Sequence, residues 1–67
     1  MRFSLKAIRV NANMTQREAA EKLGISRGTL ANWEKGKQFP DAKHIAKIEK
    51  VYGVNYDRIS FLPKNYT

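Results

Sequence analysis

The chain has 67 residues, a length that fits one small domain. It contains no cysteine, which excludes disulfides and thiolate metal sites and is consistent with a reducing, cytoplasmic setting. Its apolar runs are too short to span a membrane, and charges interrupt its first residues, unlike a signal peptide. Thirteen basic and six acidic side chains give a net charge of +7, which indicates either an anionic partner such as nucleic acid or solubility alone.

The N-terminal segment predicts a first helix over roughly residues 5–12. Ser4 precedes it as a suitable N-cap, because a serine hydroxyl can accept a hydrogen bond from the unpaired amides of a first turn. Three apolar residues then recur at helical spacing and share one face, namely Leu5, Ile8 and Ala12. The polar residues 11–13 predict the turn that follows.

The next stretch predicts two short helices that meet at a tight corner. Thr15 and Glu18 stand at the N-cap and N3 positions of a capping box, which begins the second helix. Gly24 ends that helix, because glycine readily adopts a positive φ. Ser26 caps the third helix, which runs to about residue 33 or 34. The apolar residues that would pack between the two helices are Ala19, Ala20, Leu23, Ile25, Leu30 and Trp33.

The C-terminal half predicts a loop over residues 35–40 and two further helices. Asp41 is a good N-cap for a fourth helix over residues 42–52, and Gly53 ends it. The inward residues of the fourth helix would be Ile45, Ile48, Val51 and Tyr52. Asn55 would begin a short fifth helix that carries Tyr56 and Ile59. We therefore predict an all-α, five-helix domain over residues 1–67 without strands, in which residues 61–63 pack back on the core and the last residues fray.

The string MTQREAAEKLGISRGTLANWEKGKQFPD closely resembles the Cro/CI-type (XRE family) helix-turn-helix domains of phage and bacterial regulators, which have the lambda-repressor-like fold. The resemblance covers roughly residues 3–62. It implies five helices, recognition of double-stranded DNA by the third helix, and operator binding as two-fold dimers. The motif elements that match in order and spacing are Thr15-Gln16, Ala20, Gly24-Ile25-Ser26, Trp33-Glu34-x-Gly36 and Pro40.

The first turn of the third helix would enter the major groove, so its side chains are candidates for reading bases. Arg27 is the leading candidate, because its guanidinium can pair with guanine O6 and N7; a phosphate contact or a solvated charge is the alternative. Asn32 lies five residues further on, where it would pair with adenine or remain exposed. In the family, the position that matches Gly28 typically reads a base, but glycine has no side chain and would allow only a close approach of the helix to the DNA. Thr29 would contact a thymine methyl or a phosphate.

Donors that flank the groove are candidates for phosphate contacts. Gln16 begins the second helix, where backbone amides are unpaired, and the matching residue of the family commonly binds a phosphate. Lys35 and Lys37 follow the third helix and Lys43 begins the fourth, so all three should approach the DNA backbone. Ser26 can donate to a phosphate, although a role as N-cap is the simpler interpretation.

Arg9 and Glu34 stand apart from the surface charges. The resemblance implies that these positions form a partly buried salt bridge between the first and third helices, so that Arg9 supports the fold and does not read DNA. Breaking such a pair singly is costly, because one buried charge is left uncompensated.

A single subunit would read only a few base pairs, which favours a weak homodimer that DNA strengthens. The expected contact surface lies at the C-terminal end and consists of Val54, Tyr56, Arg58 and Phe61. Val54 and Phe61 have the alternative role of closing the core. No second domain for dimerisation is apparent, so the chain resembles a Cro-sized regulator or a fragment of a longer protein.

Competing classes of function are less well supported by the residues. The sequence offers no nucleophile–base pair and no phosphate-binding glycine loop, which argues against an enzyme, and it suggests no cofactor, metal or small-molecule ligand. An RNA-binding surface would need exposed aromatic residues interleaved with basic residues, and the sequence does not show this pattern. We therefore predict a sequence-specific DNA-binding transcriptional regulator, acting as a repressor on an operator. The alternative is an antitoxin-like module that binds a protein partner as well as DNA.

Overall fold

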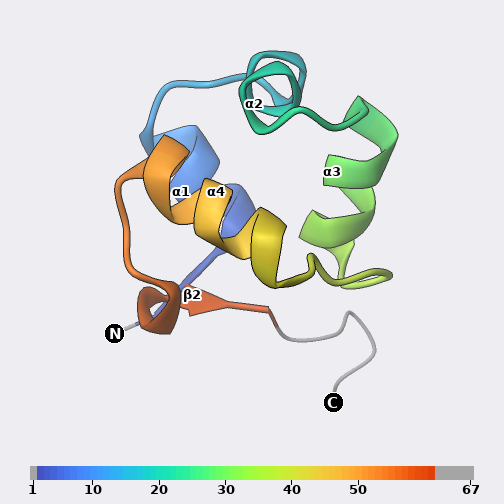
Figure 1. Ribbon diagram of the computed structural model, residues 1–67. Helices are drawn as coiled ribbons and strands as arrows, with labels where there is room; N and C mark the ends of the chain where they lie inside the picture. Colours follow the sequence, from blue (N-terminus) through green and yellow to red (C-terminus); the bar gives the residue numbers. More distant parts are fainter. Residues whose placement is uncertain (1, 62–67) are drawn as a thin grey trace.

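Four α-helices pack around one apolar core in the computed structural model, which describes residues 2–61 (Figure 1). The helix α2 packs against both α3 and α4, and α1 packs against α3 and against both strands of a small sheet. A 3-10 turn, η1, follows α4. The bounds are α1 (Leu5–Asn11), α2 (Gln16–Leu23), α3 (Arg27–Lys35), α4 (Ala42–Tyr52), η1 (Tyr56–Arg58), β1 (Phe3–Ser4) and β2 (Ile59–Ser60).

The α-helices begin where the predicted cap residues stand. In each case a cap oxygen accepts a hydrogen bond from the backbone amide three residues later, which satisfies one unpaired donor of the first turn. The cap residues are Ser4, Thr15, Ser26 and Asp41. At Thr15 the capping box is complete, since the Thr15 amide also donates to the Glu18 carboxylate. These hydrogen bonds lower the pKa of the Glu18 carboxyl and, at the start of α4, that of Asp41.

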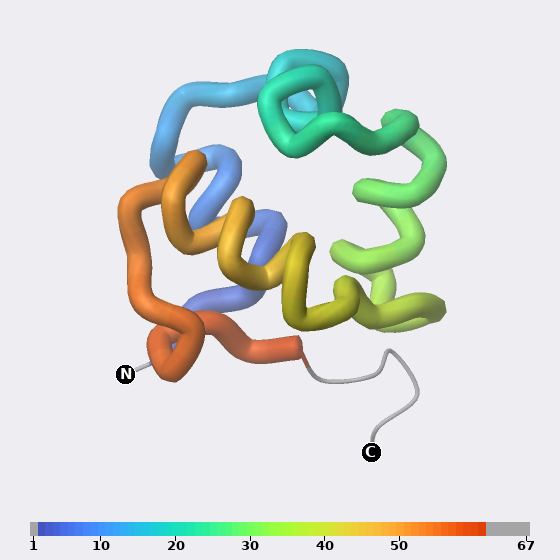
Figure 2. Tube along the Cα trace, viewed as in Figure 1, coloured from blue at the N-terminus to red at the C-terminus, as the bar shows by residue number. Residues whose placement is uncertain are grey.

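The predicted fifth helix and the predicted absence of strands are wrong. Among the described residues after α4, which end at residue 61, only residues 56–58 are helical, and they form one 3-10 turn. The next two residues pair as a parallel strand with β1, in the register Phe3↔Ile59 and Ser4↔Ser60. Figure 2 shows the two ends of the described chain side by side. Pairing with a segment at the opposite end of the chain thus decides the conformation of Ile59, whose side chain is buried.

The core lies between the four α-helices and the small sheet. Its members are Leu5, Ile8, Ala19, Ala20, Leu23, Leu30, Trp33, Ile48, Tyr52 and Ile59. Val51, Val54 and Phe61 are half-buried and pack against it, so Val54 and Phe61 do help to close the core. Two predicted core positions differ, because Ala12 is exposed at the end of α1 and Ile45 is only half-buried. The expectations for residues 62–67 lie outside the described residues.

Candidate nucleic-acid interface

The helices α2 and α3 form a helix-turn-helix with a tight corner (Figure 1). Gly24 takes φ +73° at the end of α2, a backbone conformation that a side chain would strain. The amide of Ile25 donates to the carbonyl of Ala20 over 3.0 Å and closes the turn. Leu30 and Trp33 are buried on the inner side of α3. This packing fixes α3 on the core and leaves its opposite side to solvent.

The first turn of α3 is accessible to a partner. Arg27 and Gly28 are exposed and Thr29 is half-buried. Among the described residues, a Cβ added at Gly28 would meet only the Ser26 hydroxyl, at 3.9 Å, which is an ordinary contact. Packing within the described chain therefore does not require glycine at position 28, although glycine costs about 1 kcal/mol there relative to alanine. The position is free for the close approach of another molecule.

The hydroxyls of Ser26 and Thr29 form a chain at the start of α3. The Ser26 hydroxyl accepts from the amide of Thr29 over 3.1 Å and shares a hydrogen bond of 2.9 Å with the Thr29 hydroxyl. Ser26 is therefore the N-cap of α3. Either hydroxyl can donate in this pair, because each carries one proton and two lone pairs, so one proton is left for an outside acceptor.

Asn32 is half-buried and lies against the loop that follows α3. Its carbonyl accepts from the amides of Lys37 over 2.9 Å and Gln38 over 3.4 Å. Its side-chain amide donates to Gln38 Oε1 over 3.5 Å, a long hydrogen bond. Gln38 is a residue that the sequence analysis missed, because the contact depends on how the loop folds back on α3.

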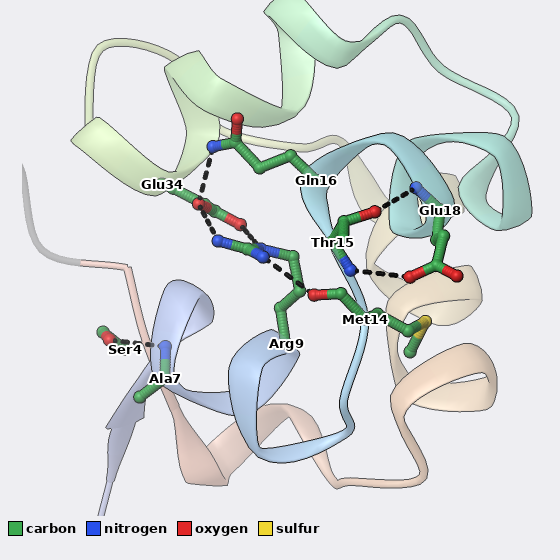
Figure 3. A network of polar contacts seen from close by, with 8 residues as sticks. All are labelled: Ser4, Ala7, Arg9, Met14, Thr15, Gln16, Glu18 and Glu34. Atoms are coloured by element: carbon green, nitrogen blue, oxygen red, sulfur yellow. Dashed lines mark hydrogen bonds and ion pairs between the residues drawn. The ribbon is translucent and has the colours of Figure 1, made fainter.

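The side chains of Arg9 and Glu34 form an ion pair between α1 and α3 (Figure 3). Arg9 Nε lies 2.6 Å from Glu34 Oε2, and Arg9 Nη2 lies 3.3 Å from Glu34 Oε1. The remaining nitrogen, Nη1, donates to the carbonyl of Met14 over 2.8 Å. The side chain of Gln16 joins the same group, because its Nε2 donates to Glu34 Oε1 over 3.0 Å.

The lysines predicted to contact phosphate lie within and on either side of the segment that joins α3 to α4. Lys35 is in the last turn of α3, Lys37 is in the loop and Lys43 is in the first turn of α4, and all three are exposed. Gln16 is half-buried at the start of α2. None of these lysines forms an ion pair within the described part of the chain, so their charges remain available to an anionic partner.

The residues of the predicted dimer surface lie in η1 or within two residues of η1 or β2, and Figure 1 shows these two elements at the bottom of the view and α3 at the right. The rings of Tyr56 and Phe61 stack with centroids 5.8 Å apart. Tyr56 is 51% exposed and Arg58 is exposed, whereas Val54 is half-buried. Val54 and Arg58 also line a groove together with residues of β1 and α1.

These features define a helix-turn-helix domain whose second helix presents an accessible first turn. The chain belongs to the Helix-turn-helix family, which matches residues 5–59.

Residues 2–61 contain no helix that is long and apolar enough to cross a membrane.

Several curated proteins are similar to this chain. An uncharacterised HTH-type transcriptional regulator of Methanocaldococcus jannaschii is 44% identical over 59 residues, which cover 88% of this chain and 89% of that protein. The HTH-type transcriptional regulator ImmR of Bacillus subtilis is 42% identical over 79% of this chain but only 42% of its own length. An uncharacterised HTH-type transcriptional regulator of Archaeoglobus fulgidus is 39% identical over 88% of this chain and 83% of its own. No solved structure gives a significant match.

Proposed function

We propose that this protein binds a specific double-stranded DNA operator and regulates transcription from it. The observation that carries the proposal is the presentation of α3, whose inner residues Leu30 and Trp33 are buried while Arg27 and Gly28 at its start are exposed. A helix held in this way can place its first turn in a major groove. Family membership and relatives named transcriptional regulators support the proposal.

Base reading falls to the accessible residues of α3. Arg27 would pair with guanine, and Asn32 with adenine through the amide atoms that Gln38 does not use. Thr29 would donate its hydroxyl proton to a phosphate or contact a thymine methyl with its own methyl group. Gly28 would let the helix backbone approach the base edges closely.

Phosphate contacts would hold α3 in register on the duplex. Lys35, Lys37 and Lys43 are exposed on either side of the loop after α3 and would neutralise phosphates. Gln16 would bind a phosphate from the start of α2, where the helix dipole is positive. A phosphate role for Ser26 is less favoured, because its hydroxyl caps the first turn of α3.

Repression by occlusion of a promoter is the regulatory outcome that we propose. Because the operator DNA of a bacterial cell lies in the cytoplasm, we propose a cytoplasmic location for the protein. Pairing of two subunits through the surface at Tyr56 and Phe61 would add a second reading helix. No cofactor or small-molecule ligand enters this mechanism.

Selection of bound sites from a random duplex library tests the proposal. We expect enrichment of one short motif, repeated about one DNA turn apart with two-fold symmetry. Titration of the selected duplex against a scrambled duplex of the same length then measures specificity. Equal affinity for the two duplexes, or no enriched motif, would contradict operator recognition.

A further inference from the structure

The side chain of Gln16 links the buried ion pair of Arg9 and Glu34 to the proposed DNA-binding surface by a hydrogen bond to Glu34. The side chains of Arg9 and Glu34 are 9% and 4% exposed, so the pair is almost fully enclosed. Gln16 is half-buried and begins α2, and its side chain contacts Glu34 from outside the pair (Figure 3). A buried charged group is thus connected to a residue at the surface by one hydrogen bond of 3.0 Å.

The chemistry of this hydrogen bond fixes the orientation of the Gln16 amide. A carboxylate only accepts hydrogen bonds, so the nitrogen of the amide must face Glu34. Figure 3 shows the Gln16 oxygen on the other side, away from Glu34. The nitrogen carries two protons, and Glu34 uses one of them. The second proton is left for an acceptor outside the network.

The charge of Glu34 would by itself oppose a phosphate, because both groups are negative. Arg9 removes this obstacle, since it donates to both carboxylate oxygens over 2.6 and 3.3 Å. Arg9 also donates to the carbonyl of Met14, just before the capping box of α2. The network therefore sets the position of the first residue of α2 relative to the last turn of α3.

We propose that Glu34 is a positioning residue for DNA binding. It holds the side-chain amide of Gln16 so that the second N–H proton donates to a phosphate oxygen, while Arg9 neutralises the carboxylate. The inference rests on the proposed function and deepens it, because it gives the ion pair a role in binding besides its role in the fold. Holding the amide before DNA arrives reduces the entropy lost on binding.

A double-mutant cycle between Gln16 and Glu34 tests the proposal. The wild type, Gln16→Leu, Glu34→Ala and the double variant are titrated with a labelled random-sequence duplex at low salt. A random duplex suffices because phosphate contacts carry no sequence information. Gln16→Leu should weaken binding about tenfold in the wild-type background and by less than about twofold with Glu34→Ala, since the amide is then no longer held. Asn11→Leu is the matched control. It also replaces an amide side chain by leucine, but Asn11 is exposed at the end of α1, on the side of that helix away from Arg9, so the affinity for DNA should stay unchanged.

A spectroscopic measurement separates positioning from support of the fold. In isotope-labelled wild type without DNA, the first of the two side-chain amide protons of Gln16, which faces Glu34, should already resonate at a hydrogen-bonded position, and Glu34→Ala should remove that shift. On titration with the duplex, the second proton should shift while the first keeps its hydrogen-bonded position. Loss of the first proton's shift on binding would mean that Gln16 leaves Glu34, which would overturn the proposal.

The outcomes distinguish this inference from the proposed function. An equal loss from Gln16→Leu in both backgrounds would overturn the role of Glu34 while DNA binding stands. A wild type that binds no duplex even at low salt would remove the proposed function and this inference with it. If Glu34→Ala does not fold, the paired replacement Arg9→Met with Glu34→Leu supplies the background, because an apolar pair of similar size can replace a buried ion pair without loss of stability.

Discussion

Arg9 Nε lies 2.6 Å from Glu34 Oε2, and this ion pair joins α1 to the last turn of α3. Arg9→Ala and Glu34→Ala should each lower the free energy of unfolding by about 3 kcal/mol, because each leaves a buried charge without its partner. The double variant should lose less than the sum, by about 1–3 kcal/mol. Thermal and denaturant unfolding of the four proteins measures this coupling, and strictly additive losses would show that the pair contributes none.

Salt should weaken DNA binding steeply. The logarithm of affinity should fall against the logarithm of salt concentration with a slope of about −0.9 for each phosphate neutralised. Lys35→Ala and Lys37→Ala should weaken specific and non-specific duplexes alike and reduce the steepness of that slope by about one. Lys50→Ala removes the same charge at the far end of α4 and serves as the control. An affinity that hardly responds to salt would argue against DNA as the partner.

Arg27 should affect specificity, in contrast to the lysines. Because its guanidinium would read one guanine, Arg27→Ala should reduce discrimination at that base pair by about 1–3 kcal/mol. Lys37→Ala should leave the ratio of specific to non-specific affinity nearly unchanged. Titrations with the selected duplex and with single base-pair variants measure both effects. If Arg27→Ala lowered affinity uniformly for all duplexes, Arg27 would be a phosphate contact instead.

Tyr52 should limit stability at alkaline pH. Its hydroxyl is buried without a hydrogen-bond partner in the described part of the chain, and burial raises its pKa from the ordinary 10.0 to about 12. The unfolded chain therefore ionises first, so the free energy of unfolding should fall as pH rises from 10.0 towards about 12. Tyr52→Phe should remove this alkaline loss and stabilise the protein at neutral pH by about 1 kcal/mol. Chemical unfolding across this pH range is the measurement, with Tyr56→Phe at the exposed tyrosine as the control. An unchanged alkaline loss in Tyr52→Phe would contradict the assignment.

Two subunits should bind cooperatively to a duplex with two half-sites. The exposed ring of Tyr56 stacks on Phe61 and offers a small apolar contact, so association of the free protein should be weak. Tyr56→Ala should reduce the gain in affinity from a second half-site and leave single half-site affinity unchanged, whereas Val10→Ala, at an exposed apolar residue of α1, should not. Sedimentation of the free protein and titration of both duplexes measure these effects. One-to-one binding at saturation without a gain from the second half-site would exclude the dimer.

Local signals in the sequence predicted the helices well. The predicted cap residues Thr15 and Ser26 lie where α2 and α3 begin, and Gly24 ends α2 with positive φ. These signals act between residues that are neighbours or one turn apart, so they can be read without the rest of the fold. The corner between α2 and α3 follows from the same short-range rules.

Contacts between distant parts of the chain were decided only by the tertiary structure. Ile59 looked like part of a fifth helix, but pairing with Phe3 makes it a strand. The carboxylate of Glu34 binds Gln16, eighteen positions earlier, and the hydroxyl of Tyr52 is enclosed without a hydrogen-bond partner among residues 2–61. Side-chain type shows which groups can form hydrogen bonds, whereas the packing of separate helices decides which of them meet. The sequence by itself therefore determined the helix-turn-helix, and the assembled core determined which polar groups on it remain free.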